Sequence, residues 1–182
     1  MIKVFYLFIL IIQMFSLYSC NSGKDGKVET SNQWNDSISV GFNQDRVKEE
    51  ELQIDLYLKH RDNLKMKSTG SGLRYQILTD ISGEPVMAGD SVDIDMKISL
   101  LDGTVCYKTD STELDQFLVD RSQVESGVHE GVKLMKKGQK AIFILTSNLA
   151  HGLLGDFKKI PPMSPIVVEL ELVEVIKNEM KK

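Results

Sequence analysis

The chain has 182 residues, of which 42% are hydrophobic and 26% charged, a balance typical of a soluble globular protein rather than a disordered chain. Its formal net charge is −4, so it lacks the basic surplus that binding to phosphate backbones requires, and we expect no nucleic-acid partner. Its two cysteines, Cys20 and Cys106, exclude a disulfide framework as the main support of the fold. The length allows one domain of ordinary size with an appendage.

The first 19 residues are typical of a secretory signal peptide. A short basic start is followed by the apolar run Val4–Ile12 and then by smaller and more polar residues. The end of this segment, Leu17-Tyr18-Ser19-Cys20, resembles a bacterial lipobox, in which the cysteine is lipidated and becomes the mature N-terminus. Two alternatives are a plain signal peptide with a chance cysteine and an uncleaved N-terminal anchor. The lipobox predicts an exported protein that is lipid-anchored in the bacterial cell envelope, at the outer membrane.

The next two segments form the predicted appendage. Residues 20–43 are rich in Asn, Ser, Gly, Asp and Lys without an apolar period, which predicts a flexible tether. Residues 44–66 contain a predicted helix, Gln44–Lys65, with early glutamates and late basic residues that complement the helix dipole. Its apolar stripe is thin, so we expect it to pack on the following domain or on a second copy, and it offers a surface for a protein partner.

A period of two dominates the rest of the chain, residues 72–176. The clearest strand alternates Val92, Ile94, Met96 and Ile98 with charged residues, as a half-solvated antiparallel sheet requires. Asp102-Gly103 predicts a hairpin turn. The other expected elements are strands at Leu73–Leu78, Phe117–Val119, Ala141–Leu145 and Ile166–Ile176 and a short helix at Val128–Met135. This order predicts an α+β domain with an antiparallel sheet.

The last predicted strand changes phase along its length. Glu169 and Glu171 alternate with apolar residues, but the alternation shifts near Val173. Such a shift indicates a β-bulge or the end of strand pairing.

Several motifs in this order resemble the FKBP family of peptidyl-prolyl isomerases. Gly89-Asp90-Ser91-Val92 is similar to the family's entry into a strand, and Leu101-Asp102-Gly103-Thr104 to its hairpin. The segment from Gly127 to Gly138, with Glu130-Gly131-Val132 at its centre, resembles the family's helix motif. Ile160-Pro161-Pro162 resembles the start of the family's Ile-Pro-Pro motif.

The resemblance implies five or six antiparallel strands curled around the short helix, with a pocket between helix and sheet. It implies rotation of X-Pro peptide bonds in proline-containing segments of exported proteins, across a barrier of ~18–20 kcal/mol. Such a pocket desolvates the amide and binds the twisted geometry best, without nucleophile, metal or cofactor.

Carried onto this sequence, the family's pocket positions fall at Met96, Tyr107, Val124, Glu125, Val128, His151, Ile160 and Val168. Several aromatic residues of the family are replaced: Val128 stands for a tryptophan, His151 for a tyrosine and Val168 for a phenylalanine. The resemblance implies that the backbone amide of Glu125 donates a hydrogen bond to the substrate carbonyl. The family has an aromatic residue and an aspartate side by side at this point of the chain. Tyr107 could replace the aromatic residue, but no carboxylate stands beside it unless Asp110 supplies one.

Other chemistry has less support in the sequence. His60, His129 and His151 lack metal-ligand spacing, and we expect His129 on the surface of the short helix. Cys106 is expected to be a small buried hydrophobic residue.

Three functions follow from these patterns. The first is a membrane-tethered prolyl isomerase that assists the folding of exported proteins, with weak activity because its pocket is altered. The second is a non-catalytic chaperone or docking module that uses the same hollow. The third is a structural part of an envelope assembly, with the helix Gln44–Lys65 as the partner surface. The lipobox and this helix together also resemble the lipid-anchored FKBP proteins associated with gliding motility.

Overall fold

The structure is a computed structural model that describes residues 36–110 and 113–178. The proposed signal peptide, Cys20 and most of the tether lie outside the described residues. The description below concerns the compact unit of residues 40–182, together with the start of helix α2 at Asp36. Its elements are α2 (Asp36–Lys59), β1 (Lys67–Ser68), β2 (Arg74–Ile77), β3 (Ser91–Leu100), β4 (Val105–Lys108), β5 (Asp115–Leu118), α3 (Ser126–Lys133), β6 (Lys140–Leu145), η1 (Ser147–Leu149, a 3₁₀ turn) and β7 (Ile166–Ile176).

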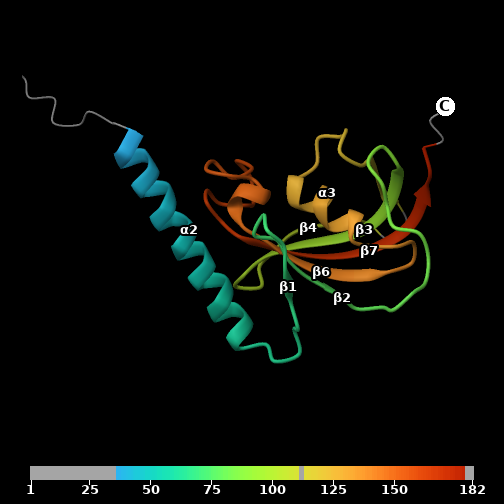
Figure 1. Cartoon of the computed structure of the whole chain (residues 1–182), viewed down its shortest axis with the longest axis horizontal. Coiled ribbons are helices and arrows are strands. Elements are labelled where there is room, and N and C mark those ends of the chain that lie inside the picture. The colour runs from blue at the N-terminus through green and yellow to red at the C-terminus, as the bar shows by residue number, and fades with distance from the viewer. Residues whose placement is uncertain (1–35, 111–112, 179–182) are drawn as a thin grey trace, which may run out of the picture. The chain divides into compact units, whose positions relative to one another are not determined.

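One antiparallel sheet carries the domain, which confirms the α+β prediction. Its strand order is β1-β2-β6-β7-β3-β4, and β5 pairs with the first half of β3 (Figure 1). The described residues thus form seven strands, more than the five or six that the resemblance implies. The additional pairing comes from β1, which consists of two exposed residues and carries no apolar pattern.

The alternation predicted for the central strand is confirmed. Val92, Ile94 and Ile98 of β3 are buried in the main core, while Asp95 and Lys97 point to the other face. The predicted turn joins β3 to β4, where the Leu100 amide donates to the Thr104 carbonyl. Each buried aliphatic side chain contributes about 1.5–3 kcal/mol to folding. An apolar pocket against the sheet can therefore form only on the face that carries these buried side chains.

The phase shift at Val173 marks a bulge, as the sequence indicates. On β7, Glu174 pairs with Asp93 and Leu172 pairs with Ile94, so Val173 is an extra residue opposite the β3 strand. The bulge lets β7 continue beside β3 to its end.

Helix α3 packs on the core face of the sheet through glycines. It begins at Ser126 and ends at Lys133, two residues earlier at each end than expected. A Cβ on Gly127 would lie 2.6 Å from Leu145 Cδ2, and one on Gly131 would lie 2.7 Å from the Phe143 ring. Only glycine allows the helix backbone to come this close to β6.

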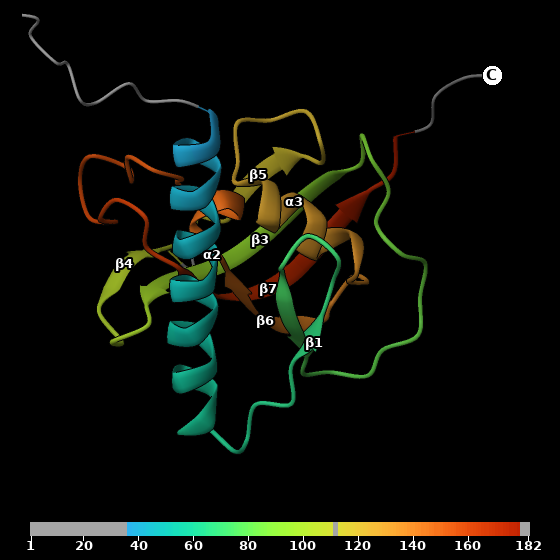
Figure 2. The ribbon, with the colours of Figure 1, turned by 60° about the vertical axis from the view of Figure 1, so that its left-hand side comes forward.

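Helix α2 covers part of the opposite face of the sheet (Figure 2). Ile54 is 1% exposed and packs against Ile144 and Val167, whose neighbours in β6 and β7 face the main core. The helix starts at Asp36 rather than Gln44 and ends at Lys59 rather than Lys65. Residues 36–43, assigned to the tether by composition, are therefore helical. Asp36 and Ser37 are residue types that favour helix starts, which composition alone does not reveal.

Candidate functional site

A hollow of about 390 Å³ opens between the core face of the sheet and the loops around α3. Strand residues form one side of it, and the segment before α3 and the loop between η1 and β7 form the other. Its lining consists of Met96, Ile98, Tyr107, Asp115, Glu125, His151, Asp156 and Lys158.

The structure brings together four of the eight predicted pocket residues. Met96, Tyr107, Glu125 and His151 line the hollow, although they come from four separate parts of the chain. The remaining four belong to the core or pack against it: Val124 is half-buried, and Val128, Ile160 and Val168 are buried. Valine at positions 128 and 168 leaves these side chains below the surface of the hollow, where a larger aromatic ring would reach further.

Asp156 organises the site loop, which we define as residues 147–160. Its Oδ1 accepts hydrogen bonds from the backbone amides of Lys158, Lys159 and Ile160 at 2.8, 2.9 and 2.8 Å. The turn needs glycine at 155, where φ is +68° and a Cβ would lie 2.2 Å from the Ile160 carbonyl oxygen. The sequence offered one signal for this turn, an Asp directly after a Gly in a loop.

The second carboxylate oxygen of Asp156 accepts a hydrogen bond from the Tyr107 hydroxyl. This bond raises the pKa of Tyr107 to about 12. Burial alone would raise the pKa of Asp156, but the bonds from Tyr107 and the three amides hold it well below its usual range. Asp156 thus supplies Tyr107 with a carboxylate from a remote loop, a partner that the sequence did not indicate. The backbones of Asp110 and Glu113 form an isolated antiparallel β-bridge.

Lys159 adds a cation to this group. Its Nζ lies 4.9 Å from the centroid of the Tyr107 ring, within the range of a cation–π contact. Tyr107 is therefore fixed from both its hydroxyl and its ring face.

His151 and Glu125 contact each other in the lining of the hollow. His151 Nε2 lies 3.0 Å from Glu125 Oε1, and both side chains are largely buried. The contact has the distance of an ion pair but not the direction of a hydrogen bond. Among the described residues, no acceptor takes a hydrogen bond from the Glu125 amide. That amide is a donor available to a ligand.

The hollow continues sideways along β4 and β5. A neighbouring hollow of about 440 Å³ shares Met96, Tyr107 and Asp115 with it. Between them, Thr109 is buried and donates to Asp115 Oδ2 at 2.5 Å. The two hollows therefore lie side by side, and we refer to them together as the groove.

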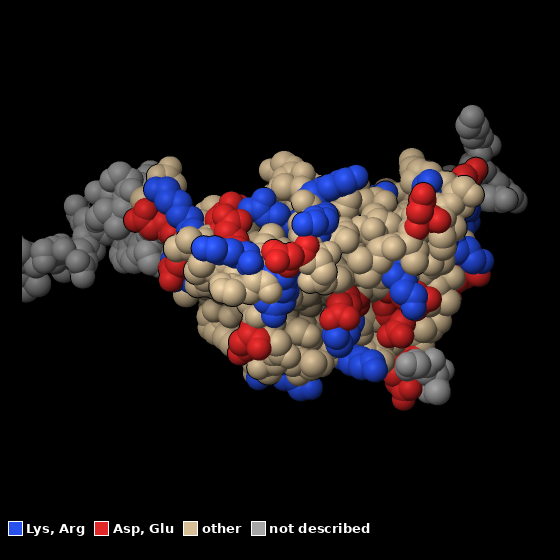
Figure 3. Space-filling view, turned by 90° about the horizontal axis from the view of Figure 1, so that it is seen from below, with Lys and Arg blue, Asp and Glu red and all other residues tan. Residues whose placement is uncertain are grey.

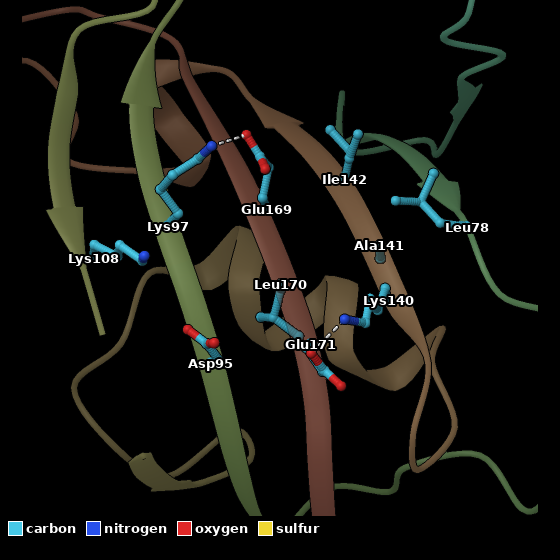
Figure 4. A pocket seen from close by; sticks show the side chains of 10 residues that line it. All are labelled: Leu78, Asp95, Lys97, Lys108, Lys140, Ala141, Ile142, Glu169, Leu170 and Glu171. Atoms are coloured by element: carbon cyan, nitrogen blue, oxygen red, sulfur yellow. Dashed lines mark ion pairs between the residues drawn. The ribbon is translucent and has the colours of Figure 1, made fainter. Parts of the chain in front are cut away.

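A third hollow, of about 290 Å³, lies on the outer face of the sheet (Figure 4). Four of its six charged lining residues form ion pairs: Lys97 with Glu169 at 2.5 Å and Lys140 with Glu171 at 2.8 Å. Acidic and basic side chains are interspersed over the face seen from below (Figure 3). Because most of its charged side chains already pair with each other, this hollow offers fewer free polar groups to a ligand.

The prediction for His129 was wrong. This residue is 7% exposed, its Nδ1 accepts from the Asp120 amide, and its Nε2 lies 3.1 Å from the Ser122 carbonyl. It ties α3 to the preceding loop. The prediction that Cys106 is buried is confirmed, since 2% of it is exposed.

Within residues 36–110 and 113–178, no three His, Cys, Asp or Glu side chains gather in a way that could hold a metal ion. The same described part of the chain contains no helix long and apolar enough to cross a membrane.

Comparison with known proteins identifies this architecture. Residues 82–173, half of the chain, match the family model of the FKBP-type peptidyl-prolyl cis-trans isomerases. The chain belongs to the FKBP family. The FKBP match begins after β2 and ends within β7, so it contains every residue that lines the hollow but excludes helix α2.

Named relatives agree with this assignment. The probable FKBP-type isomerase FkpA of Neisseria meningitidis serogroup B is 34% identical over 110 residues, which are 60% of this chain and 40% of that protein. FkpA of Escherichia coli is 32% identical over 110 residues, with the same coverage. The FKBP-type 22 kDa isomerase of Escherichia coli is 32% identical over 112 residues, 61% of this chain and 53% of that protein. The chain spans about half or less of the length of these relatives.

A solved structure supports the fold. The crystal structure of a peptidyl-prolyl cis-trans isomerase from Pseudomonas syringae pv. tomato superposes with a TM-score of 0.60 at 24% identity, and the match covers 70% of this chain and 93% of that one. This similarity concerns the FKBP fold alone.

Proposed function

We propose that the chain is a peptidyl-prolyl isomerase that assists the folding of exported proteins and is anchored to the membrane through a lipidated Cys20. The observation that carries the proposal is the combination of an apolar wall and an available amide in one hollow on this fold. Met96 and Ile98 form the wall, and Glu125, whose amide has no acceptor among the described residues, lines the same hollow from the segment before α3.

Each part has a role in rotating an X-Pro bond. The apolar wall receives the proline ring and removes water from its amide, which favours the less polar twisted state. The Glu125 amide donates to a substrate carbonyl, and His151 offers an imidazole nitrogen at the rim. Because Val128 and Val168 do not reach into the hollow, the substrate is held by less apolar surface, and the activity is weak.

The alternative is a chaperone or docking module without efficient catalysis. The charges that line the hollow favour it: Asp115, Glu125, Asp156 and Lys158 surround a wall of only two apolar side chains. A groove of this kind holds a polar extended segment without twisting it.

A solvent-jump assay on short X-Pro peptides tests the proposal. With micromolar amounts of the purified chain we expect relaxation faster than the uncatalysed rate. Met96→Asp places a charge in the wall and is expected to lower the catalysed rate by about tenfold or more, since an unpaired charge disfavours binding of an apolar ring.

Leu78→Asp provides the matched control, because Leu78 is half-exposed in the hollow on the outer face. The rate should not change in this variant. If Leu78→Asp abolishes the rate and Met96→Asp does not, the site lies on the outer face. If the chain shows no rate above background but still suppresses aggregation of an unfolded protein, the chaperone alternative holds.

The lipid anchor has its own test. Metabolic labelling with a fatty acid should mark the chain and place it in the membrane fraction, whereas Cys20→Ala should remain unlabelled. Stable anchoring needs more than one acyl chain, so partial lipidation should release the protein. A Cys20→Ala chain that stays in the membrane without label would support the uncleaved-anchor alternative instead.

We also propose an outer-membrane location and a relationship to the gliding-motility FKBP lipoproteins. The lipobox and helix α2 support both proposals. Helix α2 also supports the third hypothesis, a partner surface in an envelope assembly, because Val47, Leu52 and Leu56 are exposed on it. Deleting the helix would not test this cleanly, since Ile144 and Val167 would lose their cover. Exchanging Leu52 or Leu56 for a polar residue would leave that cover in place.

A further inference from the structure

Helix α2 carries a buried carboxylate that the isomerase proposal does not use. Glu50 is 6% exposed, although it lies on a helix outside the part of the chain that matches the FKBP family. A buried carboxylate is costly unless it is hydrogen-bonded, so its partners indicate what it does.

Both oxygens of Glu50 bind one residue of the site loop. Ser147 donates its backbone amide to Oε2 at 2.8 Å and its hydroxyl to Oε1 at 2.5 Å. Ser147 is the first residue of the turn η1, and Thr146 before it makes no side-chain capping bond. Glu50 therefore accepts from one of the amides at the start of η1 that have no partner within the turn itself.

Ser147 in turn holds the residues on both sides of His151. Its carbonyl accepts from the Ala150 amide at 3.0 Å and from the Gly152 amide at 2.7 Å. A single residue thus connects the α2 carboxylate to the turn that places His151 in the hollow.

We infer that Glu50 is a positioning residue: by fixing Ser147, it sets the conformation of residues 147–152 and the place of His151 in the substrate groove. The effect on catalysis rests on the proposed isomerase function, whereas the effect on conformation does not. Helix α2 then helps to shape the site, and its role is not limited to spacing the domain from the membrane or to binding a partner.

A neighbouring glutamate provides the matched comparison. Glu51 binds Arg74 of β2 at 3.1 Å, and this contact also holds α2 to the sheet but does not involve the site loop. Glu51→Ala removes a docking contact of α2 and leaves Ser147 untouched. Glu50→Ala removes a docking contact and frees Ser147.

Amide hydrogen exchange on the full chain separates these effects. In Glu50→Ala we expect the amides of Ser147, Ala150 and Gly152 to exchange about tenfold faster, while those of β3 and β7 keep their rates. Glu50→Gln keeps the size of the side chain and should give a smaller change. Ser147→Ala loses one of the two bonds and should add little in the Glu50→Ala background.

The inference is overturned if exchange in residues 147–152 is unchanged in Glu50→Ala. It is also overturned if Glu51→Ala accelerates the same amides equally, because the effect would then be general loosening of α2. Isomerase kinetics are then measured on the same variants. The kcat/KM for an X-Pro peptide should fall several-fold in Glu50→Ala and not in Glu51→Ala. A wild-type chain with no isomerase rate would refute the proposed function, while the exchange rates would still decide the role of Glu50.

Discussion

Asp156→Ala is expected to lower the proposed isomerase activity by about tenfold to a hundredfold while the domain stays folded. The substitution removes the acceptor of three backbone amides and of the Tyr107 hydroxyl at once. Without it the site loop loses its turn, and a shift of ~1 Å in a positioning segment can cost this much activity. The rate in the X-Pro assay and the circular dichroism spectrum together measure the effect.

The same variant makes a titration prediction. In the wild-type chain the bond to Asp156 raises the pKa of Tyr107 to about 12, above the ordinary 10.0. In Asp156→Ala the pKa should return toward 10, which tyrosinate absorbance or ring NMR shifts would show. Asp80→Ala, an exposed loop residue, is the control and should leave both rate and titration unchanged.

The pH range of this bond follows from the two shifts. The raised pKa of Tyr107 means that its contribution to stability is present below about pH 10 and is lost as the pH rises toward 12. The lowered pKa of Asp156 means that its contribution is present above the ordinary 3.8 and is lost as the pH falls below that value. The site loop should therefore be most ordered between about pH 4 and 10. A loop that loosens between pH 5 and 9 would contradict this assignment.

Gly131→Val is expected to have the largest effect on stability, a loss of about 3 kcal/mol or more. The new Cβ would begin 2.7 Å from two atoms of the Phe143 ring, which is fully buried under α3. Either the ring or the helix must move, and the better helix propensity of valine offsets only about 0.5 kcal/mol. Denaturant unfolding monitored by circular dichroism gives the value.

Gly70→Val is the matched control for this substitution. Gly70 has no heavy atom within 4 Å of the position of a new Cβ. Its effect should stay within about 0.5 kcal/mol. If both substitutions cost the same, close approach between α3 and β6 does not limit stability.

The sequence predicted the fold because its signals are local and repeated. The alternation in Val92–Ile98, the turn at Asp102-Gly103 and the phase shift at Val173 each depend on a few neighbouring residues. They determine which face of a strand is buried, and the structure agrees with all three. Strand β1 left no such trace because its two residues are exposed and are ordered only by pairing with β2.

The site was less predictable because its contacts are remote in sequence. Glu50 and Ser147 are separated by 97 positions, and Tyr107 and Asp156 by 49. The residues around one member of each pair carry no local pattern that predicts contact with the other. His129 has a polar side chain on a short helix, yet it is buried, and two backbone groups of the preceding loop satisfy its ring nitrogens. Resemblance to a family transfers positions, but it does not show which replaced residues still reach the surface.

Cys106, the one free thiol in the described part of the chain, can serve as a probe of local opening. Cys106 is buried against the site loop, with its Sγ directed at the Lys159 carbonyl at 3.6 Å, and burial raises its pKa. In this closed arrangement the thiol is poorly accessible and poorly ionised, two conditions that suppress alkylation and oxidation. A reagent can reach it only after a local opening that exposes the thiol. The rate at which Cys106 is labelled should therefore report how often this part of the domain opens.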